Sequence, residues 1–71
     1  MIGDNIRALL LENNYTQKEL AIRSGCTPWS ISRYINNVHV PGIKVMQRIA
    51  TALGVTVDEL RNIDLQRRRK M

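Results

Sequence analysis

The feature that most constrains this chain is the stretch from Thr16 to Asn37, TQKELAIRSGCTPWSISRYINN. Thr16 and Glu19 have the spacing of a capping box, in which each side chain accepts a hydrogen bond from the other residue's backbone N–H. Gly25 stands where a residue in the left-handed conformation would end that helix at low steric cost. The first part of the stretch therefore predicts a short helix over about residues 17–24 that stops at a tight turn.

A second short helix is predicted directly after the turn. Thr27 can cap its N-terminus, and Pro28 takes the first helical position, where a missing N–H does no harm. Ile31, Tyr34 and Ile35 recur at helical spacing, which predicts a helix over about residues 28–36 with one apolar side. Two short capped helices around a glycine turn match the helix-turn-helix unit, in which the two helices cross steeply.

Three further helices are predicted outside this unit. The residues from Asp4 to about Asn13 show the i, i+3, i+4 apolar pattern of a first helix. Residues 43–53 carry the widest apolar stripe, so we expect this fourth helix to be the most buried element. Thr56 and Glu59 repeat the capping-box spacing and begin a fifth helix. The chain is therefore predicted to be helical almost throughout.

The composition agrees with one small all-α domain. Seventy-one residues are enough for a single core, and the hydrophobic content of 44% is ordinary for a globular protein. The chain has no Phe, so the core must come from Leu, Ile, Val and Ala, which suits packed helices. Residues 38–42 are predicted to form a loop, because the Pro41-Gly42 pair forbids a continuing helix. We therefore predict an all-α fold, a compact bundle of five short helices.

Few chemical functions suit this set of residues. Cys26 is the only cysteine and His39 the only histidine, too few ligands for a structural zinc site or for an internal disulfide. No phosphate-binding glycine loop, carboxylate cluster or activated Cys–His pair is present, so we predict no enzyme, no cofactor and no small-molecule substrate. The sequence shows no signal peptide and no membrane-spanning segment. We expect a cytoplasmic protein without a membrane partner.

The positive charge is unevenly distributed along the chain. The net charge is +5, and residues 67–70 are four consecutive cations, so the rest of the chain carries only +1. We therefore divide the chain into a helical domain over residues 1–63 and a basic, flexible tail over residues 64–71. Such a tail either aids solubility or adds a non-specific attraction to phosphate groups.

The motifs resemble those of a known family. The pattern Q-x-x-L-A-x-x-x-G is formed by Gln17, Leu20, Ala21 and Gly25. It is followed by S-I-S-R at residues 30–33 and, in register, by IATALGVTVDEL at residues 49–60. Over about residues 2–63 the chain is similar to the phage repressor and Cro-like, or XRE-type, helix-turn-helix family. The resemblance implies a lambda-repressor-like DNA-binding domain, with the helix-turn-helix formed by the second and third helices.

The resemblance also implies a set of contacts with double-stranded DNA. In this family the third helix enters the major groove. The positions expected at base edges are Thr27, Pro28, Trp29 and Arg33, with Ser32 near the groove wall. Arg33 is the strongest of these, because its planar fork can donate two hydrogen bonds to the O6 and N7 atoms of guanine. The positions expected at DNA phosphates are Gln17, Lys18, Asn36, Asn37 and Lys44, and Arg23 is a further candidate.

The chain departs from the family pattern at three places. Pro28 and Trp29 stand where polar residues usually begin the reading helix, and the loop at 38–40, Val-His-Val, lacks the Lys or Arg that related DNA binders often hold there. Leu10 and Ile35 stand where members of the family often have an Arg–Glu ion pair. Hydrophobic replacement of such a pair is often neutral or favourable for stability.

Two functions follow from these observations. The first is a sequence-specific DNA-binding regulator, a small Cro-like repressor that occupies an operator, as a homodimer on half-sites about one helical turn apart. The dimer contact would use Val57, Leu60, Ile63 or Leu65, unless these residues complete the core. The alternative is an antirepressor-like modulator on the same fold. It would bind another regulator protein through Trp29 and the apolar loop, because an exposed tryptophan is a common interface anchor.

Overall fold

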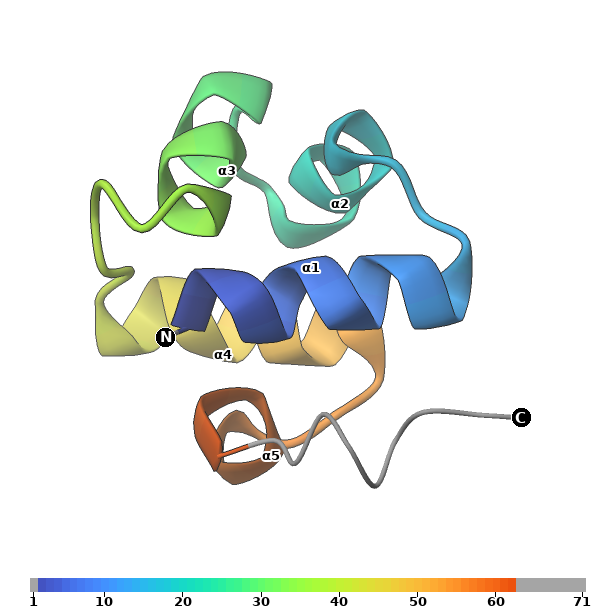
Figure 1. Cartoon of the computed structure of the whole chain (residues 1–71), viewed down its shortest axis with the longest axis vertical. Coiled ribbons are helices and arrows are strands. Elements are labelled where there is room, and N and C mark those ends of the chain that lie inside the picture. Colours follow the sequence, from blue (N-terminus) through green and yellow to red (C-terminus); the bar gives the residue numbers. More distant parts are fainter. Residues whose placement is uncertain (1, 63–71) are drawn as a thin grey trace.

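The computed structural model describes residues 2–62, which form five α-helices and no strand. The helices are α1 (Ile2–Asn13), α2 (Gln17–Ser24), α3 (Pro28–Ile35), α4 (Ile43–Leu53) and α5 (Val57–Asn62). In Figure 1, α2 and α3 lie next to each other above α1, and α5 lies below it. The predicted all-α, five-helix fold is confirmed. The basic segment predicted as a tail, residues 64–71, lies outside the described residues.

Local hydrogen bonds set the ends of the short helices, as the sequence predicts. In the capping box of α2, the Glu19 backbone N–H donates to Thr16 Oγ1 over 3.1 Å, and the Thr16 N–H donates to Glu19 Oε1 over 2.8 Å. The same reciprocal pair joins Thr56 and Glu59 before α5. Gly25 adopts the left-handed conformation after α2, with φ 72°. The bounds of α2 and α4 are those predicted, α1 begins two residues earlier, and α3 ends one residue earlier.

The core collects apolar side chains from all five helices. The largest fully buried side chains are Ile6, Leu9, Leu20, Ile31, Ile35, Ile49 and Leu60. Burial of each such side chain contributes roughly 1.5–3 kcal/mol relative to leaving it in water. Because two of these residues lie on α3, the inner side of that helix is fixed against the rest of the molecule.

The prediction that α4 is the most buried helix is wrong. Ile43, its first residue, is 57% exposed, and Val45 is only half-buried. More residues of α1 are buried, among them Gly3 and Asn5, which no apolar pattern marks. Figure 1 shows α1 and α4 running together through the middle of the molecule, with α2 and α3 above them and α5 below. The difference lies at the first turn of α4, where Ile43 and Lys44 are exposed although Ile43 belongs to the apolar stripe.

Asn5 is buried because it completes the end of α5. Its Nδ2 atom donates to the carbonyl oxygen of Leu60 over 2.8 Å and to that of Arg61 over 3.3 Å. The last carbonyls of a helix have no partner within it, and a buried amide is well suited to supply one. Leu60 itself is fully buried, so it belongs to the core and not to a dimer contact. Ile63 and Leu65, the other dimer candidates beyond Val57, lie outside the described residues.

The N-terminus of α1 packs closely against the C-terminal end of α3. The backbone N–H of Gly3 donates to Asn37 Oδ1 over 3.0 Å. A Cβ atom at Gly3 would lie 2.7 Å from that oxygen and closer still to the carbonyl oxygens of Tyr34 and Ile35. Only glycine therefore permits this approach. Leu10 and Ile35, which replace the family's frequent ion pair, are both buried in the core.

We predict that Gly3→Ala lowers the free energy of unfolding by about 1–3 kcal/mol, because the added methyl group meets backbone oxygens that cannot move freely. Urea unfolding followed by far-ultraviolet circular dichroism measures the change. Gly42→Ala is the matched control: Gly42 has φ −68°, and nothing lies within 4 Å of the position of its Cβ. Equal effects of the two substitutions would contradict this account of the α1–α3 contact.

Candidate nucleic-acid interface

The third helix presents one side to the core and the other to solvent. Ile31 and Ile35 are fully buried on the inner side. The outer side carries Trp29, which is 68% exposed, and the half-buried Ser32 and Arg33. Because α1 and α2 both pack against α3, these outer side chains are held on a firmly supported helix.

The hydroxyl group of Thr27 is used to begin α3. Thr27 Oγ1 accepts a hydrogen bond from the Ser30 backbone N–H over 3.1 Å and donates one to Ser30 Oγ over 3.0 Å. Pro28 follows at the first helical position, without a donor of its own. These two residues, both predicted at base edges, thus begin the helix. The first exposed side chain of α3 that carries a hydrogen-bond donor is Trp29.

Trp29 and Arg33 form a stacked pair on the outer side of α3. The Cζ atom of Arg33 lies 4.6 Å from the centroid of the Trp29 ring, within the range of a cation–π interaction. The two residues are one helical turn apart, the spacing at which side chains of a helix meet. Arg33 Nε is buried and has no hydrogen-bond partner. Because Nε is buried, the terminal nitrogens are the donors through which Arg33 can meet a ligand.

Asn36 and Asn37, predicted at phosphates, are partly engaged within the protein. Asn37 adopts the left-handed conformation with φ 60°, and its Oδ1 atom holds the N-terminus of α1. Asn36 Nδ2 donates to Ser32 Oγ over 3.3 Å, while Asn36 Oδ1 accepts a long hydrogen bond of 3.5 Å from Arg7 Nη2. Arg7 thus joins the edge of this surface from α1. No local pattern marks it, because its partner lies 29 positions further along the chain.

Gln17 and Lys18 occupy the first two positions of α2 and are exposed. The capping box occupies the backbone N–H groups of Thr16 and Glu19, so those of Gln17 and Lys18 remain available to an anion. The positive end of the helix dipole favours negative charge at the same place. The structure is thus suited to phosphate contact at both predicted positions on α2.

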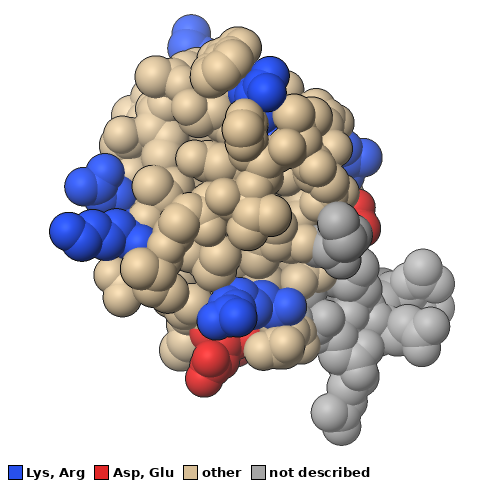
Figure 2. Space-filling model, turned by 90° about the vertical axis from the view of Figure 1, so that its left-hand side faces the viewer, with Lys and Arg blue, Asp and Glu red and all other residues tan. Residues whose placement is uncertain are grey.

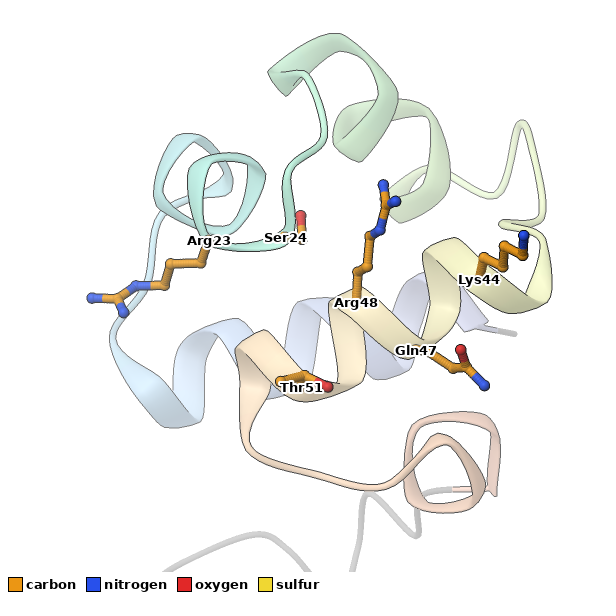
Figure 3. A pocket seen from close by; sticks show the side chains of 6 residues that line it. All are labelled: Arg23, Ser24, Lys44, Gln47, Arg48 and Thr51. Carbon is orange, nitrogen blue, oxygen red and sulfur yellow. The ribbon is translucent and has the colours of Figure 1, made fainter.

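Lys44 lies with two arginines beside a hollow between α2 and α4. The hollow has a volume of about 470 Å³ and is lined by Arg23, Ser24, Lys44, Gln47, Arg48 and Thr51. Figure 3 shows Arg48 and Lys44 rising from α4 on the side of α2 and α3, whereas Arg23 points away. Arg23 stacks on the ring of Tyr15 at 4.5 Å. None of these six described residues is a carboxylate, so their positive charge is not neutralised within the lining.

Arg48 was not predicted as a functional residue. Its signal in the sequence is its position four residues after Lys44, which places both side chains on one side of α4. The contribution of α2 to the same hollow depends on tertiary packing and has no sequence signal. The predicted phosphate-binding residues thus form separate groups: one at the start of α2, one at the end of α3, and one on α4 that gains Arg48.

An apolar surface lies beside the outer side of α3. It comprises the exposed side chains of Trp29 (68% exposed), Val38 (56%), Val40 (73%) and Ile43 (57%), which we call the apolar patch. Figure 2 shows the side of the molecule on which α3 and the loop after it lie, with Lys and Arg mostly at the margins and uncharged atoms filling the middle. Exposed apolar surface of this kind commonly marks a binding site. The polar and the apolar parts of this face meet at Trp29.

Comparison with known families defines the class of the protein. The family model described as helix-turn-helix matches residues 6–60. The match begins at Ile6 on α1 and ends at Leu60 on α5, and both side chains are fully buried in the core. The chain therefore belongs to the helix-turn-helix family of the Cro-like, XRE type, a family of DNA-binding transcription regulators and not of enzymes. No curated protein and no solved structure matches the chain significantly.

Two further kinds of site are absent from residues 2–62. No helix in this part of the chain has the length and apolar character that a membrane crossing requires. Within the same residues, no group of three or more His, Cys, Asp or Glu side chains is arranged to hold a metal ion.

We predict that Asn37→Ala lowers the free energy of unfolding by about 1–3 kcal/mol, because it removes the acceptor for the Gly3 N–H and places alanine at a positive φ. Asn37→Asp keeps an acceptor oxygen at the positive end of α1 and should stay within about 0.5 kcal/mol of the original chain. Thermal and urea unfolding measure both variants. A loss of the same size in both would show that the hydrogen bond to α1 is not what Asn37 contributes.

Proposed function

We propose that the protein is a sequence-specific transcription regulator, a small Cro-like repressor that acts in the cytoplasm by occupying an operator. The observation that carries this proposal is the outer side of α3, where Arg33 stands half-buried on a helix whose inner side is locked in the core. In a chain of this family, such an arginine is suited to read a guanine in the major groove. Control would come through protein concentration and competition for the site.

The other proposed contacts with DNA fall into two groups, those with phosphates and those with the groove wall. The free N–H groups of α2 at Gln17 and Lys18, and the cations Lys44 and Arg48 on α4, are suited to DNA phosphates, which fix position without reading sequence. Ser32 on α3 and Asn36 directly after the helix are joined by a hydrogen bond, and the groove wall would lie beside them. Arg33 is then the group on which base recognition depends. We take residues 1–63 as the unit that carries these contacts.

We propose that two copies bind a near-palindromic operator, with half-sites about one helical turn apart. Since Leu60 is in the core, the half-buried Val57 is the described residue on α5 that remains for a contact between copies. The tail over residues 64–71, with its four cations, would add non-specific attraction to the DNA backbone.

A second candidate function is favoured by the apolar patch. An antirepressor-like modulator would use Trp29, Val38 and Val40 to bind another regulator protein and alter that protein's occupancy of DNA. An apolar contact of this kind differs from DNA binding in one measurable property. DNA binding weakens steeply with rising salt because counterions are released from the phosphates, whereas burial of apolar surface is far less sensitive.

We predict that selection from a pool of random duplexes enriches a defined sequence and that Arg33→Ala lowers affinity for it by about 1–3 kcal/mol, or roughly 5- to 150-fold. Fluorescence anisotropy at low and physiological salt measures affinity for the selected duplex and for a scrambled one. The substitution should weaken binding to the selected duplex far more than binding to the scrambled one, because Arg33 is assigned to a base.

Two variants serve as controls in the same measurement. Lys44→Ala/Arg48→Ala should weaken binding to both duplexes alike, because phosphate contacts carry no sequence information. Arg61→Ala, on α5 at the opposite end of the molecule from α3, should change neither affinity beyond a small electrostatic effect (Figure 1). Failure to enrich any sequence at either salt concentration would contradict the proposed operator recognition and leave the modulator as the function to pursue.

A further inference from the structure

We propose that Trp29 is a positioning residue: it does not read a base itself but holds the guanidinium of Arg33 in the orientation that recognises the O6 and N7 edge of guanine. This inference rests on the proposed function and deepens it by assigning the basis of sequence recognition. Two independent observations support it. The ring lies 4.6 Å from Arg33 Cζ, and Arg33 Nε is buried without a hydrogen-bond partner.

The first observation concerns the freedom of the arginine side chain. An exposed arginine samples many rotamers, and ordering it on binding opposes recognition. Stacking on a large aromatic face holds the guanidinium plane before DNA arrives, so less conformational entropy is lost when the complex forms. Trp29 is well suited to this task because it is one helical turn before Arg33 and offers the strongest ring for a cation.

The second observation fixes which donors face outward. A guanidinium can meet guanine through its two terminal nitrogens or through Nε and one of them. Because Nε is buried, only the end-on approach is open, in which the two terminal nitrogens donate to O6 and N7. The geometry therefore selects one mode of guanine recognition, and the stack with Trp29 maintains it.

The surroundings leave the arginine free for a ligand. Trp29 and Arg33 line a hollow of about 260 Å³ together with Ser30, Tyr34, His39 and Val40. None of these described lining residues is a carboxylate, so none of them competes with a base by pairing its charge with the guanidinium. An apolar partner that covered Trp29 would also remove water from the stacked guanidinium, and burying an unpaired charge is costly. A stacked cation would therefore weaken a tryptophan that served only as an anchor for such a partner.

The stack can be tested without DNA because Trp29 is the only tryptophan in the chain. In the original protein, the guanidinium covers part of the ring and should shield it from a neutral quencher such as acrylamide. We predict that Arg33→Ala raises the quenching constant of Trp29 fluorescence measurably, whereas Lys44→Ala leaves it unchanged. An unchanged constant in Arg33→Ala would show that the stack does not persist in solution and would overturn the inference whatever the protein binds.

The decisive test compares the selected duplex with one in which the recognised guanine is replaced by 7-deazaguanine, which lacks the N7 acceptor. The original protein should bind the modified duplex roughly tenfold more weakly, because one of the two hydrogen bonds is lost. Trp29→Ala should bind both duplexes almost equally, because Arg33 is no longer held at the guanine edge. Trp29→Phe, which keeps an aromatic face, should restore most of the discrimination.

The outcomes separate the inference from the proposed function. Enrichment of a sequence, with full sensitivity to 7-deazaguanine retained in Trp29→Ala, would overturn the positioning role and leave operator recognition intact. A double variant, Trp29→Ala/Arg33→Ala, whose loss of binding free energy equals the sum of the two single losses would likewise overturn it. A residue that acts through another gives coupled and not additive losses. If no sequence is enriched, the proposed function fails, and the assignment of Trp29 to guanine recognition fails with it.

Discussion

The contact between the N-terminus of α1 and the C-terminal end of α3 supports the rest of the binding surface. The Gly3 N–H donates to Asn37 Oδ1, and glycine alone leaves room for the carbonyl oxygens of α3 to lie so close. Ile31 and Ile35 anchor the inner side of α3 in the same region of the core. A helix of eight residues is too short to be stable by itself in water, so α3 depends on these contacts for its shape and orientation.

The outer side of α3 combines two kinds of chemistry that favour different partners. Arg33, the start of α2 and the cations beside the hollow on α4 suit a polyanion, as the family's function requires. The apolar patch around Val38 and Val40 suits a protein, and the absence of cations in that loop weakens the attraction to phosphates. Trp29 belongs to both surfaces. Because the Trp29 ring stacks on Arg33, we infer that Trp29 acts with the polar surface. This contact says more about the role of Trp29 than the exposure of its side chain does.

Local signals made most of the fold predictable from the sequence. The capping box at Thr16, the cap at Thr27 and the left-handed Gly25 fix the ends of α2 and the start of α3 through hydrogen bonds within a few residues, so their spacing was sufficient. The buried Asn5 and the close approach at Gly3 depend on residues more than 30 positions away, and no periodicity reports such contacts. Arg7 and the hollow that Arg48 shares with α2 also depend on contacts between distant parts of the chain, so the sequence does not indicate them. Arg33 is predicted because it matches a position of the family motif.

We propose that α3 and the start of α2 form the surface that meets DNA. Backbone amide chemical shifts measured by ¹H–¹⁵N NMR, during titration with a short duplex at low salt, test it most directly. We expect the largest changes at residues 28–35 and at Gln17 and Lys18, with α5 nearly unaffected. Changes that are absent from α3, or spread evenly over all five helices, would contradict it.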